Sequence, residues 1–361
     1  MNGTKFITCP ASHHRIENIH NGKVASGTVK AGGQDKPAPG RYIPLGCDQF
    51  NRFQMMNFNE HMHCLRGTHL KTQGCVMGRW FAGIVHDNLP PHLAQGMFSK
   101  PGAYDVIMRY SSLTPKLVPD NIPAPRGIGM KIFGVEGEKL WGEDKRTQDW
   151  TFNNYPVLEL RDPETTHDIA DSRNWNDLGT FADEQSKRVD ADVATLGMVA
   201  MPEYSQSAYR FGDYVAKFGV FPLGEEQKKL EDTEIKESDP INIISQELRS
   251  FHMKNKVTYS FCAQLLQDLR EHPDSWLPEF RVWWDDRITV NSWHGLKVHQ
   301  PLGSTNRMRR VVYAESRKLR LRVNGHEDYV EPMGLNEVPV PVPTPQLPLR
   351  HQHALQTTEV A

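Results

Sequence analysis

Four short runs of apolar, aromatic and β-branched residues follow one another in the first half of this chain. They cover residues 74–85, 104–112, 127–135 and 149–160, and glycine, proline or charged residues separate them. Runs of this length and punctuation are typical of strands. Their spacing favours an antiparallel sheet or barrel over alternating strand–helix–strand units.

Helical patterns appear in the second half, at residues 165–175, 184–200 and 263–272. The strongest runs from 306 to 325, where Gly325 can serve as a C-terminal cap. We therefore expect an α+β protein with one folded domain over residues 46–330. Residues 1–45 and 331–361 are rich in glycine or proline and are predicted to be an extended arm and a tail. Because such an arm can wrap a neighbouring subunit, we expect a homodimer.

Composition excludes several classes of partner. Hydrophobic residues make up 38% of the chain, charged residues 24%, and the net charge is -2. This balance gives no electrostatic reason to expect a nucleic acid or an anionic membrane as partner. The apolar runs are shorter than the roughly 18 residues of a membrane span. The five cysteines are scattered and the N-terminus lacks a signal pattern, so a cytoplasmic location is expected.

The common signatures of other enzyme classes are missing. His61, His63, Cys64 and His69 bring two types of metal ligand close together, but a zinc site usually has a second cluster, and the sequence shows none. There is no GxSxG elbow for a serine hydrolase and no glycine-rich phosphate loop.

The helical pattern at 306–325 carries an unusual stripe. Arg309 and Tyr313 are four residues apart and share one face of the helix, and Ser316 and Arg320 continue it. A guanidinium next to a phenol favours the ionised phenolate. A tyrosinate is a known axial ligand of haem iron.

Four further segments precede this helix. They are residues 66–69 (RGTH), 108–112 (MRYSS), 125–133 (PRGIGMKIF) and 149–157 (DWTFNNYPV). Singly, each is compatible with an ordinary surface strand or turn. In this order, together with residues 309–320, they resemble the catalase-like haem protein superfamily, which includes catalases and catalase-fold allene oxide synthases. The resemblance covers about residues 60–325.

The resemblance implies a catalase-like antiparallel β-barrel with surrounding helices, and haem b (iron protoporphyrin IX) buried between the barrel and the C-terminal helix. Tyr313 would be the axial ligand of the iron, and Arg309 would keep it ionised. His69 would move a proton between the two peroxide oxygens, and Asn153 would hydrogen-bond the peroxide. The remaining cofactor-binding positions implied, at the haem propionates or beside the ligand helix, are Arg66, Arg109, Ser111 and Arg320.

Some positions depart from the catalase pattern. Leu158 and Glu159 replace an aromatic pair, and Thr166 takes the place of a phenylalanine near the distal haem face. Thr68 stands before His69 where catalases have valine and allene oxide synthases have threonine. A less aromatic distal wall would admit a larger substrate, and Thr68 is expected to restrain dismutation of hydrogen peroxide.

The expected function is therefore that of a haem enzyme acting on an organic, fatty-acid type hydroperoxide. A small catalase or peroxidase consuming hydrogen peroxide, a non-catalytic haem-binding protein and a metal-free binding protein are the alternatives.

Overall fold

The computed structural model describes residues 42–67, 69–82, 89, 91, 93–113, 117–122, 124–142, 145–155, 163, 197–265, 268–281 and 287–339. For residues 77–82, 265 and 268–281 only the backbone is described. The expectations for Thr68, Leu158, Glu159 and Thr166 lie outside these ranges. The expected helix at 165–175, nearly all of that at 184–200 and most of the predicted arm and tail lie outside them too.

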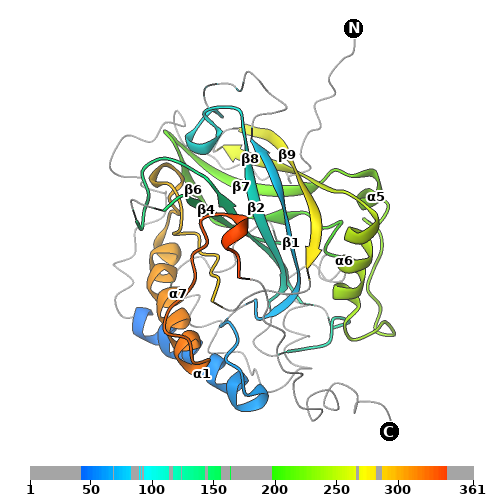
Figure 1. The fold of residues 1–361 in the computed structure, drawn as a ribbon, viewed down its shortest axis with the longest axis vertical. Helices are drawn as coiled ribbons and strands as arrows, with labels where there is room; N and C mark the ends of the chain where they lie inside the picture. Colours follow the sequence, from blue (N-terminus) through cyan, green and yellow to red (C-terminus); the bar gives the residue numbers. More distant parts are fainter. Residues whose placement is uncertain are drawn as a thin grey trace.

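One antiparallel sheet dominates the described structure (Figure 1). Its strands occur in the order β5-β4-β3-β2-β1-β9-β8-β7-β6, and β5 pairs with β7 as well as with β4. The pairing thus returns to its starting strand, and the sheet curls into a barrel. The strands are β1 (Lys71–Ala82), β2 (Gly102–Ser112), β3 (Arg126–Phe133), β4 (Thr147–Asn153), β5 (Glu203–Tyr204), β6 (Tyr209–Phe211), β7 (Tyr214–Pro222), β8 (Val257–Leu265) and β9 (Asp268–Arg281).

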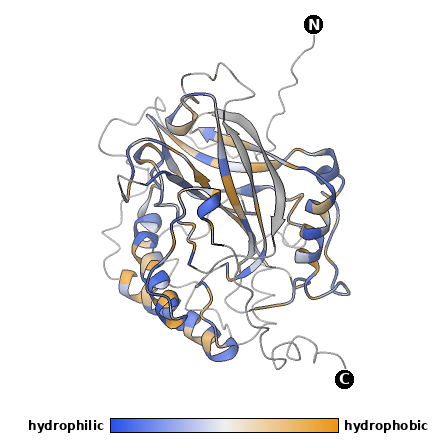
Figure 2. Ribbon diagram, in the orientation of Figure 1, coloured by the Kyte–Doolittle hydropathy of each residue, from blue (hydrophilic) through white to orange (hydrophobic). Residues whose placement is uncertain are grey.

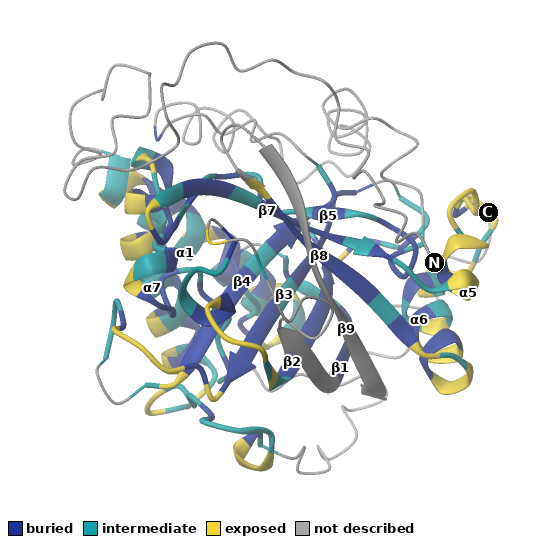
Figure 3. Ribbon diagram, turned by 90° about the horizontal axis from the view of Figure 1, so that it is seen from above, coloured by how far each residue is buried: buried dark blue, intermediate teal, exposed yellow. Residues whose placement is uncertain are grey.

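Alternation along the strands divides the sheet into two faces. The inner face is apolar and forms the main core, with Tyr110 on β2, Ile128 on β3 and Trp150 on β4. Trp150 packs edge-on against Phe218 of β7, with ring centroids 4.6 Å apart. The outer face carries the intervening residues of the same strands, many of them polar or glycine. Figure 3 shows that β2, β3 and β4 are largely buried, so their polar face is covered as well.

Two long helices cover part of the outer face. Helices α1 (Tyr42–His61) and α7 (Ser304–Val323) pack side by side on one flank of the sheet (Figure 1). Both mix hydrophobic and hydrophilic residues along their length (Figure 2). The shorter helices are α5 (Glu225–Lys228), α6 (Ile243–Lys254) and the 3-10 turns η2 (Gly96–Phe98), η3 (Lys297–His299) and η4 (Leu335–Glu337). Among the described residues, no helix is both long and apolar enough to cross a membrane.

The sequence predicts β1–β4 and α7 correctly, but it fails at residues 263–272 and at α1. The four strand predictions correspond to β1–β4, and the helix predicted at 306–325 is α7, with Gly325 at a φ of +77° just beyond its end. The helix predicted at 263–272 is wrong, because its described residues, 263–265 and 268–272, lie in the paired strands β8 and β9. Helix α1 was not predicted, and it begins at Tyr42, within the range expected for the arm.

The chain remains packed beyond residue 330, where the folded domain was expected to end. Glu331 forms an ion pair with Lys131 of β3. Val338 is buried with Ile107, Phe133 and Ile288 against the outer face of the sheet. Residues up to 339 therefore belong to the folded body.

Candidate active site

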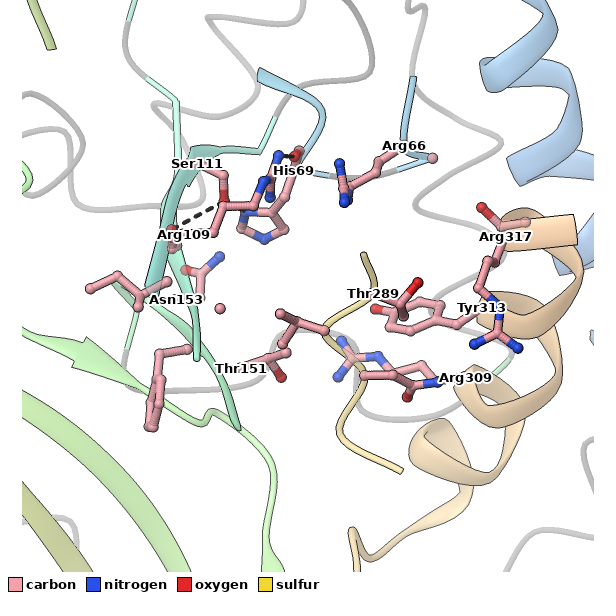
Figure 4. Close-up of a pocket in the computed structure, with 18 of the residues that line it drawn as sticks. Arg66, His69, Arg109, Ser111, Thr151, Asn153, Thr289, Arg309, Tyr313 and Arg317 are labelled. Carbon is pink, nitrogen blue, oxygen red and sulfur yellow. Dashed lines mark hydrogen bonds between the residues drawn. The ribbon is translucent and has the colours of Figure 1, made fainter. Parts of the chain in front are cut away.

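A cavity of about 170 Å³ lies between the outer face of the sheet and α7. Side chains approach it from two sides (Figure 4). His69, Ser111 and Asn153 come from the sheet side, and Arg309, Tyr313 and Arg317 project from α7. Phe50 of α1 and the loop at 289–291 complete the lining.

Strand register brings the sheet-side residues together. The pairs Thr72–Ser111, Ser111–Gly127, Gly127–Asn153 and Asn153–Tyr204 form one continuous row across β1 to β5. Residues that are neighbours in such a row have Cα atoms about 4.5–5.5 Å apart. Strands β2 to β5 therefore place four residues that are distant in sequence in one row on the outer face, and all four line the cavity.

His69 precedes β1 in an unusual backbone conformation. Its φ is +48°, in the left-handed region that few residues other than glycine adopt. Arg109 Nη2 donates a hydrogen bond to the His69 carbonyl (2.6 Å), and Arg109 Nε donates to Thr72 Oγ1 (2.9 Å). Arg109 lies on the adjacent strand β2, and its two hydrogen bonds stabilise the strained turn at His69. Strain of this kind is common at functional sites.

The hydrogen bonds of Ser111 indicate the tautomer of the His69 ring. The Ser111 hydroxyl donates to the Gly127 carbonyl (3.1 Å) and lies 3.2 Å from His69 Nδ1. Because a hydroxyl has one proton, the Ser111 oxygen then accepts from Nδ1–H, and Nε2 is left as a free base. Burial, followed by the charges of Arg109 and Arg309, lowers the pKa of His69 to about 3. The imidazole is therefore neutral at physiological pH.

Gly127 is required by this arrangement. A Cβ at this position would lie 2.4 Å from His69 Cε1 and 2.8 Å from the Phe152 carbonyl oxygen. The imidazole thus lies directly over the backbone of β3.

Asn153 ends β4 at the same level of the sheet. Its side chain is buried, and its Oδ1 accepts a hydrogen bond from the Tyr155 amide (3.1 Å). This leaves the Nδ2 group as the donor that Asn153 can offer to a ligand in the cavity.

The α7 side presents Tyr313 with an arginine one turn before it. Arg309 and Tyr313 both line the cavity, and the Tyr313 ring lies 6.1 Å from that of Phe50. Arg309 Nη1 donates to Asn306 Oδ1 at 3.5 Å. Gln54 of α1, which is fully buried, bonds both the carbonyl and the hydroxyl of Ser316 at 3.0 Å, so α1 fixes the position of α7.

The cavity has a strongly positive lining. Its described lining residues include five arginines, at positions 66, 109, 309, 317 and 320, and no aspartate or glutamate. Burial, opposed by Cys75, lowers the pKa of Arg109 to about 9, which still leaves it charged at neutral pH. Arg66 Nη2 donates to the Ile288 carbonyl (2.9 Å). A ligand with negative charge suits such a lining.

All predicted site residues except Thr68, which lies outside the described residues, line this one cavity. Their roles remain predictions. Three further residues were missed: Gly127, Thr289 and Arg317. Arg317 lies four residues after Tyr313, so the helical stripe could have revealed it, whereas no sequence signal pointed to Thr289.

The solved structures that match this chain include two catalases. A fungal catalase matches with a TM-score of 0.53 and 16% identity, over 79% of this chain and 67% of its own. Catalase A from Saccharomyces cerevisiae matches with a TM-score of 0.53 and 17% identity, over 79% of this chain and 70% of its own. The chain has a catalase-like fold.

The similarity to these catalases shows the fold alone, because the sequence identities of 16% and 17% are too low to show a shared function. No protein-family model matches the sequence, and no curated protein matches it by sequence comparison. The predicted fold class is nevertheless confirmed. In this catalase-like fold the cavity lies between the outer face of the barrel and the last long helix.

Proposed function

We propose that this protein is a haem-dependent enzyme that cleaves the O–O bond of an organic, fatty-acid type hydroperoxide. The observation that carries the proposal is the placement of His69 and Asn153 on one side of a single cavity and Tyr313 on the other. A base, a hydrogen-bond donor and a phenol facing one space are the protein groups that peroxide chemistry at a haem needs.

The chemistry of the lining residues suits a haem. Tyr313 would ligate the iron, and Arg309, one turn earlier on α7, would favour its phenolate. Arg66, Arg109 and Arg320 are the predicted partners of the propionates, and the excess of guanidinium groups over carboxylates in the lining supports an anionic ligand. When bound, haem would supply the redox chemistry at its iron.

His69 would act as the acid and base of the reaction. Its Nε2 accepts the proton of the hydroperoxide and returns it to the oxygen that departs. The Ser111 hydroxyl holds Nδ1 protonated, and the lowered pKa of His69 keeps Nε2 available as a base. Asn153 Nδ2 would donate a hydrogen bond to the peroxide and orient it.

The choice of an organic substrate rests on the sequence around the distal side. Thr68, Leu158, Glu159 and Thr166 replace apolar or aromatic residues of catalases. A hydrogen-peroxide-consuming catalase or peroxidase is the second candidate, and the fold of the matching catalases favours it.

The absorption spectrum of the purified protein tests the cofactor. We expect a haem Soret band in the wild type. Tyr313→Phe should abolish or strongly shift it, because the phenylalanine cannot ligate iron, while the far-ultraviolet circular dichroism is retained. An unchanged haem spectrum in Tyr313→Phe would show that the ligand is another residue.

Turnover on hydrogen peroxide and on a fatty-acid hydroperoxide, measured side by side, tests the substrate. Faster loss of the fatty-acid hydroperoxide supports the proposal. Rapid oxygen release from hydrogen peroxide alone supports the second candidate, and haem binding without turnover of either supports a non-catalytic haem protein.

A further inference from the structure

Two buried polar groups in the cavity have no partner among the described residues. They are the Thr289 hydroxyl, on the loop that precedes α7, and Nη1 of Arg317, on α7 itself. A buried hydrogen-bonding group that is left unpaired is costly, and native structures rarely retain one without a reason. Both groups therefore indicate a ligand atom that would supply the missing hydrogen-bond partner.

The guanidinium of Arg317 is held in place from one side. It lies over the ring of Tyr329, 4.1 Å from the centroid. Tyr329 belongs to the segment after α7, which the buried ion pair of Glu331 with Lys131 fastens to the sheet. An arginine fixed by stacking loses less side-chain freedom when it binds an anion than a free one does.

The chemistry of the two groups narrows the ligand class. A guanidinium offers donors only, and a threonine hydroxyl that lines the same cavity can also donate a hydrogen bond to a ligand. Since the described lining contains no carboxylate, a ligand must bring the acceptor and the negative charge. A carboxylate has both, and its two oxygens can accept from two donors at once.

We propose that Thr289 and Arg317 form a carboxylate-binding subsite of this cavity. The inference rests on the proposed function, because the carboxylate comes either from a haem propionate or from a fatty-acid substrate. In both cases the subsite would orient the ligand between the sheet and α7. It adds two residues to the arginines already predicted to hold the cofactor.

The first arm of the test titrates the protein with haem and with haem dimethyl ester, whose propionates are uncharged. Arg317→Met removes the guanidinium, and Thr289→Val removes the hydroxyl at nearly constant volume. Arg310→Met is the matched control, because Arg310 lies on the same helix, stacks on Trp293 at 5.1 Å and is exposed. If a propionate occupies the subsite, Arg317→Met should raise the Kd for haem about tenfold or more and leave that for the ester unchanged.

The second arm measures calorimetric binding of octanoate and of methyl octanoate to the protein as purified. If a substrate carboxylate occupies the subsite, Arg317→Met and Thr289→Val should weaken octanoate binding and leave haem binding intact. Methyl octanoate should then bind all variants alike. Thr289→Val provides the result if Arg317→Met fails to fold.

The outcomes separate this proposal from the proposed function. If the wild type binds no haem, the proposed function fails, and the octanoate arm still decides the subsite. If the wild type binds haem and both variants bind haem and octanoate as Arg310→Met does, the subsite is refuted and the haem assignment stands.

Discussion

His69 has surroundings that set its protonation state. Its Nδ1 lies 3.2 Å from the Ser111 hydroxyl, and burial lowers its pKa to about 3. The ring is therefore neutral over the whole physiological pH range. In the proposed mechanism it would accept a proton from a peroxide without a prior change of its protonation state.

We predict that His69→Ala retains the haem band and loses peroxide cleavage by roughly 10²–10⁴-fold, the usual contribution of a general acid or base. In the wild type, titration of His69 should not reduce the rate between pH 8 and pH 5, since the pKa is far below this range. Rates and spectra measured together check both statements. Loss of haem together with activity would make His69 a ligand or a structural residue.

Gly127 gives a second prediction at the same scale. In Gly127→Ala the new methyl group would meet the His69 ring at 2.4 Å, so the imidazole must move. A displacement of about 1 Å can cost on the order of 10²-fold in rate. Gly102→Ala on β2 is the control, because its Cβ would meet nothing closer than 3.8 Å. Equal rates for the two alanine variants would contradict the role of Gly127.

At the scale of elements, the strands β1–β4 were predictable because short apolar, aromatic and β-branched runs are separated by glycine, proline or charged residues. The row from Thr72 to Tyr204 was not predictable, since register depends on pairings between distant segments. Helix α1 escaped prediction for a local reason. Its buried residues include Gln49, Gln54 and Asn57, so it lacks the apolar stripe by which a helix is recognised. The error at 263–272 arose because a short apolar run fits both a helix and a strand.

The polar contact between α1 and α7 carries a prediction. Gln54→Leu removes the hydrogen-bond partner of the Ser316 hydroxyl. It also removes the donor to two backbone carbonyls, those of Leu65 and Ser316. We expect a loss of about 1–3 kcal/mol in unfolding free energy and weaker haem binding, because α7 carries Tyr313. Asn59→Leu, at an exposed position of α1, is the control. Urea unfolding and haem titration measure the two effects, and a Gln54→Leu protein as stable as the control would contradict this.

At the scale of the whole molecule, a buried cluster of charges joins the C-terminal segment to the barrel. Lys131 of β3 lies between Asp149 of β4 (2.9 Å) and Glu331, and none of the three side chains is more than 5% exposed. His294 lies 3.7 Å from Asp149 and 3.6 Å from Glu331, and its pKa is well below its usual value because it is buried. Two carboxyl groups therefore share one lysine.

Unequal effects on stability follow from this arrangement. Lys131→Met would leave two buried carboxyl groups facing each other, and we expect it to lower the unfolding free energy by about 3–5 kcal/mol. Glu331→Gln keeps an oxygen that can accept from Lys131 and Thr147, and the Lys131–Asp149 pair survives. Its cost at neutral pH should be about 1 kcal/mol or less. Urea unfolding measures both changes. Equal losses of unfolding free energy in the two variants would contradict the conclusion that both carboxyl groups depend on Lys131.

The pH dependence of stability supplies an independent check on the same cluster. Burial, and then the charge of Glu331, raises the pKa of Asp149 to about 8. A carboxyl group whose pKa is raised on folding binds its proton more tightly in the folded state, so its contribution to stability is lost as the pH rises through about 8. The wild type should therefore lose stability as the pH rises from about 5 to about 8, and the loss should level off above that. Glu331→Gln should lose less over the same interval, because it removes one of the charges that raise the pKa of Asp149. Urea midpoints at pH 6, 7, 8 and 9 measure both slopes, and parallel slopes would mean that Glu331 and Asp149 titrate independently.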